Sequence, residues 1–341
     1  MKKLHAAPTL SDVAKKAGVS TATVSRCLNE PDKVIERTRE RVMAAVRELG
    51  YSPNFGARVM AARRTNTIGA IIPTMENAIF ARAIQAFQEA LRAEGFTLLV
   101  ASSSYQEELE DEQIRSLVAR GADGLLLIGH GRDPAIYRFL ERQGIPALVT
   151  WTLDATVKRP SIGFDNRAAM HLMAQKIFSL GHRKAAMISA PCDSNDRARA
   201  RVVGVKDAMV EAGLDPASLV LLETPYSIEN GASAFDQLMQ APQKPSVVLC
   251  GNDVLAVGAL RRARELGLNV PEDVSITGFD DIELAEIAVP ALTTVHIPHR
   301  EMGRRAAEML VKMVQTGAPA HSVALYPELR LRGSLGPFSP R

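Results

Sequence analysis

The sequence predicts an α/β fold with a small all-helical head at its N-terminus, and three observations support this. Residues 1–66 show the periodicity and capping residues of short helices. From Thr67 to near the end of the 341-residue chain, short apolar runs alternate with helical periodicity. The head carries thirteen Lys or Arg against six Asp or Glu, whereas the whole chain has a net charge of only +3. A basic head on a mildly acidic body indicates a nucleic-acid-binding module, although a solvated basic tail would have the same charge.

Three short helices are predicted in the head. The first spans Ser11–Ala17 and ends at a glycine, the second follows the N-cap Ser20 and runs to Leu28, and the third runs from about Glu36 to Leu49. A further helix-compatible segment, Phe55–Arg63, has too little apolar surface to be stable alone. We therefore expect this segment to become ordered conditionally.

The remainder of the chain predicts parallel sheets. Each apolar run is followed by roughly 10–15 residues of helical periodicity, as in Ala78–Ala93 and Ala168–Leu180, which is typical of parallel strands covered by helices on both faces. The predicted strands are Ile68–Pro73, Phe96–Ser102, Gly124–Ile128, Pro146–Trp151, Ala185–Ala190, Val220–Thr224, Ser246–Cys250 and Ser275–Gly278. Because these units exceed one comfortable open sheet, we expect two Rossmann-like lobes side by side.

Composition excludes several classes of protein. The longest apolar stretches are far shorter than the ~20 residues that span a bilayer, and the N-terminus lacks the apolar segment of a secretory signal. Cys27, Cys192 and Cys250 are widely spaced without a CxxC pair, which argues against a disulfide framework or a zinc site. We expect a protein of the reducing cytoplasm, without a membrane segment.

Catalytic and cofactor motifs are missing from the sequence. There is no GxGxxG after the first strand, no GxxxxGK[ST] and no GxSxG. The close histidine pair, His296 and His299, has a proline between its members that breaks helical spacing. We expect no enzyme activity, no cofactor and no metal.

The second head helix has the features of a helix that enters the major groove of DNA. Apolar positions 24, 27 and 28 share one face and can pack on the first helix. Ala22 and Arg26 then face outward, one turn apart. A small residue allows close approach to the bases, and an arginine can bind guanine O6 and N7 together. The alternative is a surface helix with one solvated arginine.

The combined pattern resembles LacI/GalR-family transcriptional regulators over nearly the whole chain. The segments that carry the resemblance are Thr9–Ala14, Ala17–Ser20, Thr23–Arg26, Asn29 and Leu49–Asn54 in the head, and Ile68–Gly69, Gly163–Asn166, Gly181–His182, Asn252–Asp253, Ala256–Ala259, Gly278–Asp281 and Leu292–Val295 in the body. The resemblance implies a helix-turn-helix head, a hinge helix and a two-lobed sensor domain similar to periplasmic sugar-binding proteins. It also implies a homodimer on a pseudo-palindromic DNA operator.

The resemblance assigns roles to head residues by position. The implied base-reading residues are Thr21, Ala22 and Arg26. The implied phosphate-contacting or supporting residues are Ser20, Thr23, Ser25 and Asn29. The implied minor-groove residues of the hinge are Asn54, Ala57 and Met60. Met60 stands where the family most often has leucine, a stiffer wedge between base pairs, and Ile35 stands where relatives usually offer a capping hydroxyl.

The domain boundaries expected from the resemblance are a head at 1–51, a hinge at 52–65 and an effector-binding and dimerisation domain at 66–341. Within that domain, we expect one lobe from 66–163 with 293–322, and the other from 164–292 with 323–341. The tail after Leu331 has glycines and prolines but no heptads, so a tetramer-forming coiled coil is not expected.

The effector is expected between the lobes, at the carboxyl ends of the strands. The candidate contacts are Pro73, Asn77, Phe80, Trp151, Arg201, Asn252 and Asp280. Three alternatives stay open: Trp151 as interlobe packing, Asn252 as a helix cap only, and Arg201 as part of a solvated charge run with Arg197 and Arg199, which compete for its role. Ile297, where some sugar-sensing relatives have a polar residue, predicts a less polar ligand edge.

We therefore predict a dimeric, effector-responsive transcriptional repressor whose ligand is a sugar, a glycoside or a sugar acid. The alternative of a different class is a solute-binding protein or a sugar-modifying enzyme on the same two-lobed fold. That alternative predicts a secretion signal or a catalytic cluster, and the sequence has neither.

Overall fold

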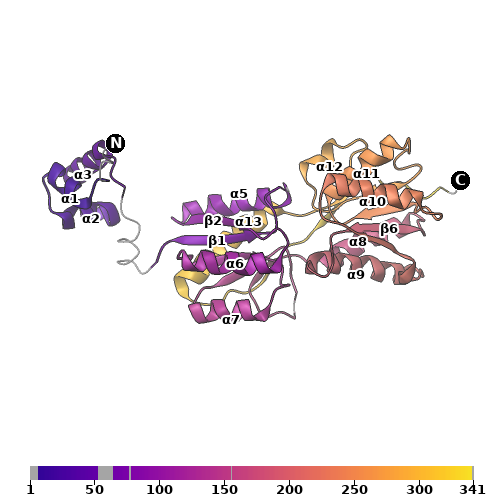
Figure 1. Ribbon diagram of the computed structural model, residues 1–341, viewed down its shortest axis with the longest axis horizontal. Coiled ribbons are helices and arrows are strands. Elements are labelled where there is room, and N and C mark those ends of the chain that lie inside the picture. The colour runs from indigo at the N-terminus through magenta and orange to yellow at the C-terminus, as the bar shows by residue number, and fades with distance from the viewer. Residues whose placement is uncertain (1–6, 53–63, 77, 155, 340–341) are drawn as a thin grey trace, which may run out of the picture. The chain divides into compact units, whose positions relative to one another are not determined.

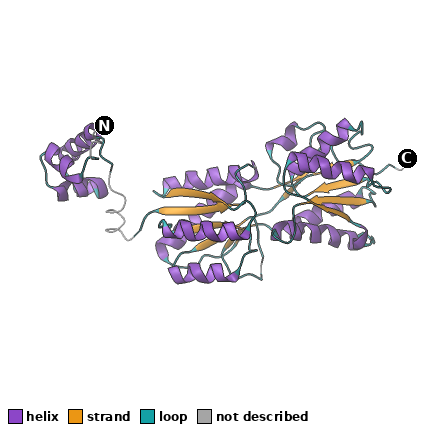
Figure 2. Cartoon of the chain, viewed as in Figure 1, coloured by secondary structure: helices purple, strands orange, loops and turns teal. Residues whose placement is uncertain are grey.

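The computed structural model describes residues 7–52, 64–76, 78–154 and 156–339 (Figure 1). The chain divides into two compact units, Met1–Thr65 and Asn66–Arg341. Among the described residues, every strand lies in the second unit (Figure 2). The predicted hinge contacts Asn54, Ala57 and Met60, and the predicted effector contact Asn77, lie outside the described residues.

The first unit is a small bundle of helices. Its elements are α1 (Leu10–Ala17), α2 (Thr21–Asn29), the 3-10 turn η1 (Pro31–Lys33) and α3 (Glu36–Leu49). The three predicted helices are thus confirmed to within one residue at each end. The core between them is made of Val13, Ala14, Ala17, Val24, Cys27, Val42 and Ala45.

Local capping explains where these helices begin and end. Ser20 Oγ accepts a hydrogen bond of 3.1 Å from the backbone N–H of Thr23, which satisfies one free donor at the start of α2. Gly18 and Gly50 follow α1 and α3 with φ of 64° and 63°, a left-handed conformation that glycine adopts without steric cost.

The second unit begins with a six-stranded parallel sheet in the order β11-β5-β4-β3-β1-β2. The strands are β1 (Thr67–Ile72), β2 (Thr97–Ser102), β3 (Gly124–Ile128), β4 (Ala147–Thr150), β5 (Ser161–Gly163) and β11 (Val323–Ala324). The helices are α5 (Ala78–Ala93), α6 (Glu107–Ala119), α7 (Pro134–Gln143) and α13 (His299–Thr316). Helices α5 and α13 pack on one face of this sheet, and α6 and α7 on the other (Figure 1).

The second lobe repeats this plan around a four-stranded parallel sheet in the order β7-β6-β8-β9. Its strands are β6 (Ala185–Ser189), β7 (Val220–Glu223), β8 (Val247–Cys250) and β9 (Ser275–Thr277). Its helices are α8 (Asn166–Ser179), α9 (Asp196–Glu211), α10 (Ile228–Gln240), α11 (Asp253–Glu265) and α12 (Glu283–Ile287), with the 3-10 turn η2 (Pro216–Ser218). The predicted fold class, a helical head with a two-lobed α/β body, is confirmed.

The last part of the chain, from β10 onward, contacts both lobes. β10 (Thr294–His296) pairs antiparallel with β12 (Glu328–Arg330) in a small separate sheet. β11 pairs with β5, so 323–324 belong to the first sheet and not, as the sequence suggests, to the second lobe. A two-residue strand has no periodic signal of its own, and it forms here because the edge of β5 offers backbone partners. The tail beyond β12 also reaches the second lobe, where Phe338 N donates to Leu180 O at 2.8 Å.

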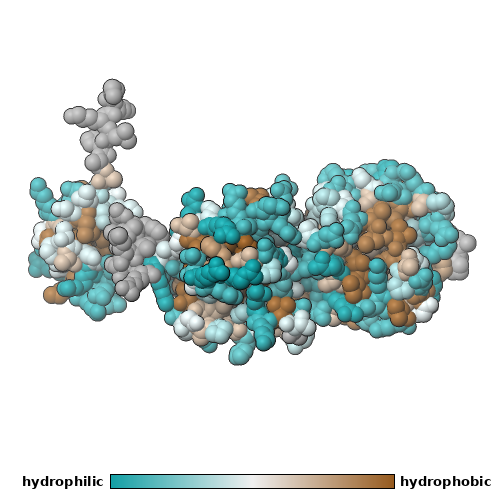
Figure 3. Space-filling view, turned by 60° about the horizontal axis from the view of Figure 1, so that its bottom comes forward, coloured by the Kyte–Doolittle hydropathy of each residue, from teal (hydrophilic) through white to brown (hydrophobic). Residues whose placement is uncertain are grey.

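All eight predicted strands are present, whereas β5, β10, β11 and β12, each of two or three residues, were not predicted. No helix of the described residues is long and apolar enough to cross a bilayer. The face of the molecule drawn in Figure 3 is largely hydrophilic, with apolar areas on the body.

Candidate functional site

The outer face of α2 presents the predicted base-reading residues. Val24 and Cys27 are buried in the core of the head, whereas Thr21, Ala22 and Arg26 are exposed. Among the described residues, no acidic side chain forms an ion pair with Arg26. Its guanidinium is therefore available for an acceptor outside the head.

The predicted phosphate-contacting residues surround the N-terminal end of α2 and its last turn. The hydroxyl oxygens of Ser20 and Thr23 lie 2.9 Å apart, and Asn29 Nδ2 donates to Ser25 Oγ at 3.3 Å. The positive end of the helix dipole lies beside Ser20 and Thr23, which favours an anion at that end of α2. Ile35 is the N-cap of α3, forms no side-chain capping bond and is 79% exposed, so the capping hydroxyl of the family is missing.

In the second unit, the predicted effector residues lie where parallel strands of both lobes end. Pro73 follows β1 and Trp151 follows β4 in the first lobe, while Asn252 and Asp280 follow β8 and β9 in the second. All four residues are buried. Pro73 contributes its carbonyl oxygen, which accepts a bond of 3.2 Å from Ser102 Oγ.

Trp151 joins aromatic residues of the first lobe. Its ring centroid lies 5.0 Å from that of Phe80 and 6.2 Å from that of His299, and its indole N–H is buried without a hydrogen-bond partner. Trp151 has a φ of 61°, a conformation uncommon for a bulky residue. Backbone strain of this kind costs about 1–3 kcal/mol and is concentrated at binding sites.

Arg201 lies on α9 of the second lobe, and Asn166 links it to the first lobe. It is only 6% exposed, its Nη1 donates to Asn166 Oδ1 at 2.7 Å, and its Nη2 donates to the hydroxyl of Tyr226 at 2.8 Å. Asn166 in turn donates from Nδ2 to the carbonyl of Trp151 at 2.9 Å. Arg201 is therefore a buried, hydrogen-bonded side chain, and not one of a run of solvated charges.

Asp280 is the acidic residue of this region and lies beside His299. Its Oδ1 lies 3.9 Å from His299 Nε2, and its φ of 107° is again unusual for a residue other than glycine. Tyr105 packs against Tyr226, with the two ring centroids 5.9 Å apart. Burial and then the Tyr226 hydroxyl raise the pKa of Tyr105, so it stays a neutral phenol. Aromatic, cationic and acidic groups thus surround one region between the lobes.

Asn252 both caps a helix and leaves a donor free. Its Oδ1 accepts a bond of 2.9 Å from the backbone N–H of Leu255 at the start of α11, whereas its Nδ2 is buried without a partner. The neighbouring Asp253 is structural: its carboxyl accepts from Thr294 Oγ1 at 2.6 Å and from Ile282 N at 2.8 Å. Burial, and next the Asp280 carboxylate, raise the pKa of Asp253 well above its ordinary value.

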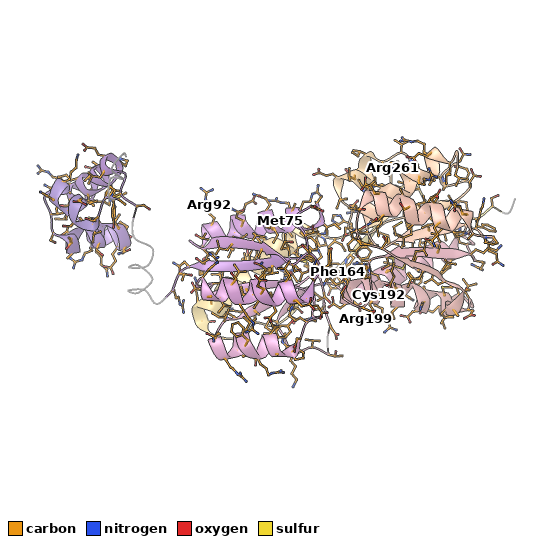
Figure 4. The ribbon with its side chains drawn as sticks, in the orientation of Figure 1. Met75, Arg92, Phe164, Cys192, Arg199 and Arg261 are labelled. Carbon is orange, nitrogen blue, oxygen red and sulfur yellow. The ribbon has the colours of Figure 1, made fainter. Side chains whose placement is uncertain are left out.

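A second contact between the lobes lies beside a groove of about 710 Å³. Asp196, at the start of α9, accepts hydrogen bonds from the backbone N–H groups of His130 at 2.6 Å and Gly131 at 3.2 Å. Arg197 forms an ion pair with the same carboxylate at 2.9 Å. Arg199 instead points outward beside Cys192, whose carbonyl accepts its Nη1 hydrogen bond at 2.9 Å (Figure 4). Arg197, Arg199 and Arg201, the three candidates for one effector-contacting arginine, therefore have three different environments.

Several residues of the site were not singled out from the sequence. Asn166 lies in a segment that carries the family resemblance, and Tyr226 and Tyr105 follow strands β7 and β2, so their positions at strand ends are the sequence signal for them. His299 was considered only as a metal ligand. The pairing of Asp196 with backbone N–H groups has no signal in the sequence, because its partners lie more than 60 residues away.

Comparisons with known proteins agree with this geometry. Residues 9–54 match the model of bacterial regulatory proteins of the lacI family, and residues 174–335 match a periplasmic binding protein-like domain. The HTH-type transcriptional regulator GntR of Pseudomonas aeruginosa is 35% identical over 309 residues, which cover 90% of this chain and 89% of that protein. This chain belongs to the lacI family.

Other members of the family are similar to this lacI-family regulator over almost its whole length. The transcriptional repressor PurR of Shigella sonnei is 34% identical over 335 residues, covering 97% of this chain and 98% of that protein. The crystal structure of the Lac repressor dimer bound to operator and an anti-inducer has a TM-score of 0.85 and 28% identity, covering 97% of this chain and 100% of that one. The chain is thus a DNA-binding transcriptional regulator with a ligand-binding sensor domain.

Proposed function

We propose that this lacI-family regulator is a repressor that binds a pseudo-palindromic DNA operator as a homodimer, under the control of a small effector. The observation that supports the effector site is that buried nitrogen atoms of Trp151, Arg201 and Asn252 have no hydrogen-bond partner within the described residues. Buried polar groups ordinarily have hydrogen-bond partners, so these unpartnered atoms support a site for a ligand. The similar regulators are not enzymes, and the proposal includes no catalytic step.

We assign a separate role to each segment of the chain. Residues 1–51 form the DNA-binding head, 52–65 the hinge and 66–341 the effector-binding and dimerisation domain. Thr21, Ala22 and Arg26 read bases, while Ser20, Thr23, Ser25 and Asn29 contact phosphates or support α2. Asn54, Ala57 and Met60 act in the minor groove. The cytoplasm is the proposed place of action, because operator DNA is found there.

The effector is proposed to be a sugar, a glycoside or a sugar acid that binds between the lobes. Its proposed contacts are Pro73, Asn77, Phe80, Trp151, Arg201, Asn252 and Asp280. A ligand that prefers one arrangement of the lobes changes the population of the DNA-binding state. A coupling of ~1–3 kcal/mol would change operator affinity by ~5–150-fold.

The experiment selects operator sequences from random DNA with the purified full chain, and then measures affinity by fluorescence anisotropy at one fixed salt concentration. We expect a selected palindrome to bind at least ~10³-fold more tightly than random DNA. A thermal-shift screen of sugars, glycosides and sugar acids then identifies ligands, since a ligand at ~100 times its Kd adds ~2.7 kcal/mol. Equal affinity for selected and random DNA would contradict the proposal.

A further inference from the structure

His130 lies at a contact between the two lobes, in the loop that follows β3 of the first lobe. Its backbone N–H donates to Asp196 Oδ2 of the second lobe at 2.6 Å, and the N–H of Gly131 donates to the same oxygen at 3.2 Å. These two bonds form only while the lobes are close together. The side chain of His130 is therefore held at the contact by its own backbone.

The loop that carries His130 is fixed to the first lobe. The buried guanidinium of Arg132 donates from Nη1 to the carbonyl of Gly129 at 2.8 Å and from Nη2 to the carbonyl of Ile128 at 3.1 Å. The N–H of Gly129 donates to the carbonyl of Thr150 at 3.0 Å. Separation of the lobes therefore breaks the bonds to Asp196 but leaves the bonds within the first lobe in place.

The imidazole of His130 has no hydrogen-bond partner at this contact. Both ring nitrogens are buried, and neither has a partner within the described residues. A buried neutral ring loses its hydrogen bonds to water, but a buried protonated ring without partners loses much more hydration energy. Burial therefore lowers the pKa of His130 below its ordinary value of 6.5, although the Asp196 carboxylate opposes this.

The charged groups around the ring do not titrate near neutral pH. Hydrogen bonds from Thr156 hold the pKa of Asp154 below its ordinary value of 3.8. Burial raises the pKa of Asp196, but Arg197 outweighs burial and this pKa also lies below 3.8. The other charged groups near the ring or on the adjoining groove are Arg132, Arg159, Asp165, Arg167 and Arg199. Because carboxylates and guanidinium groups ordinarily titrate outside pH 5–8, His130 is the described group of this contact that titrates in that range.

We propose that His130 is a pH switch for closure of the sensor lobes: the neutral imidazole allows the lobes to close, and a proton on the ring favours their separation. In the open arrangement the ring is hydrated and takes up a proton near pH 6.5. The closed arrangement binds that proton less readily. Closure is therefore fully stabilised above about pH 6.5 and weakens as pH falls, by at most about tenfold per pH unit for one proton.

One consequence rests on the proposed function. An effector that binds between closed lobes should bind less tightly in mild acid, because part of its binding free energy is then used to close them. The switch itself requires neither effector nor DNA. A test on the lobes alone thus separates failure of this inference from failure of the repressor function.

Hydrogen–deuterium exchange of backbone N–H groups measures lobe separation in the full chain. Exchange is followed at single residues between pH 5.5 and pH 8, and each rate is corrected for the intrinsic rate at that pH. Protection of His130 and Gly131 should be constant above pH 7 and fall by about three- to tenfold at pH 5.5. The N–H of Gly129, which is bonded within the first lobe, should keep its protection.

Two results in the unmodified chain overturn the proposal. Constant protection of His130 and Gly131 from pH 8 to pH 5.5 shows that closure does not depend on a proton. An equal fall at Gly129 shows that the loop unfolds, instead of the lobes separating.

Variants locate the effect in the imidazole. His130→Phe keeps a ring but cannot titrate, and its backbone N–H still reaches Asp196. Because the ring nitrogens have no partners, His130→Phe should keep the protection seen at pH 7.5 and show the same protection at pH 5.5. His130→Gln should also lose the pH dependence, since it cannot titrate either.

His182→Gln is the matched control, because it removes another buried imidazole, whose partners Ser246 and Gly336 lie away from this contact. It should keep the pH dependence of exchange at His130 and Gly131. An unchanged pH dependence in a folded His130→Phe or His130→Gln protein overturns the proposal. If neither variant folds, the comparison of Gly129 with His130 and Gly131 in the unmodified chain decides it.

Discussion

The carboxylate of Asp196 accepts a hydrogen bond of 2.6 Å from the backbone N–H of His130, and this bond joins the two lobes of the sensor domain. The N–H of Gly131 adds a second bond at 3.2 Å, and Arg197 holds the carboxylate at 2.9 Å. Successive backbone N–H groups form a concave site for an anion. Here an aspartate of the opposite lobe fills that site, so the contact is present only when the lobes are close together.

Asp196→Asn should weaken lobe closure, because the amide keeps one acceptor oxygen but loses the negative charge. Hydrogen bonds to charged groups contribute about 1.5–3 kcal/mol, and we expect a loss of about 1–2 kcal/mol in the free energy of unfolding. Urea unfolding at pH 7 measures it. The exposed Asp193→Asn serves as the control and should leave stability unchanged. Equal stability of the two variants would remove the role assigned to this contact.

The same contact predicts a pH dependence. Burial raises the pKa of Asp196, but Arg197 and the N–H groups of His130 and Gly131 outweigh burial and hold the pKa below its ordinary value of 3.8. A pKa that is lower in the folded state means stabilisation that is complete above the ordinary value and lost as pH falls through the folded value. The stability difference between wild type and Asp196→Asn should therefore be present at pH 7 and shrink below about pH 4. A difference that persists at pH 2 would show that charge is not its cause.

Gly129→Ala should disrupt this contact sterically. A Cβ at Gly129 would lie 1.9 Å from Arg197 Nη1 and 2.6 Å from Asp196 Oδ1. Gly144 has a similar φ, 67° against 72°, but open space around its Cβ position. Both substitutions cost about 1–2 kcal/mol of backbone strain, so Gly144→Ala is a matched control. Thermal unfolding and ligand affinity should both be lower in Gly129→Ala than in Gly144→Ala, and identical behaviour would contradict the packing described.

Arg26→Ala should reduce operator affinity by about 1–3 kcal/mol and relax selectivity at one base pair, because an arginine in the major groove can bind guanine with two hydrogen bonds. Affinity for random DNA should fall much less. The comparison uses selected and random duplexes at one salt concentration. Arg47→Ala removes another exposed charge, from the last turn of α3, and controls for net charge. An equal loss on both duplexes would make Arg26 a phosphate contact instead of a base reader.

His182 should make the sensor domain less stable in mild acid. Its Nδ1 lies 2.9 Å from Ser246 Oγ and its Nε2 lies 3.0 Å from the carbonyl oxygen of Gly336, which ties the C-terminal tail to the second lobe. Burial lowers the pKa of His182, although the Gly336 carbonyl opposes this. Because the unfolded chain then takes up the proton first, stability falls as pH drops below about 6.5, by at most about 1.4 kcal/mol per pH unit.

Urea unfolding between pH 5 and pH 8 tests this prediction. His182→Gln should flatten the dependence on pH, whereas the exposed His321→Gln should keep it. If both variants follow the wild-type curve, another group controls the acid response.

The sequence by itself determined the local structure of this protein and its family. Alternating apolar runs and helical periodicity located the eight predicted strands, and Ser20, Gly18 and Gly50 located helix ends, because these signals depend on residues within a few positions of each other. The outward direction of Arg26 followed from the spacing of apolar residues along α2.

Only the tertiary structure decided which groups meet. Arg201 contacts Asn166 and Tyr226, which are 35 and 25 residues away in sequence, and Asp196 contacts His130 across the two lobes. The pairing of β11 with β5 joins segments about 160 residues apart. Such contacts have no local signal, because they arise from the packing of parallel sheets that bring distant strand ends to one edge. The physical reason is the same in each case: the chain encodes its elements locally, whereas a binding site depends on distances between elements.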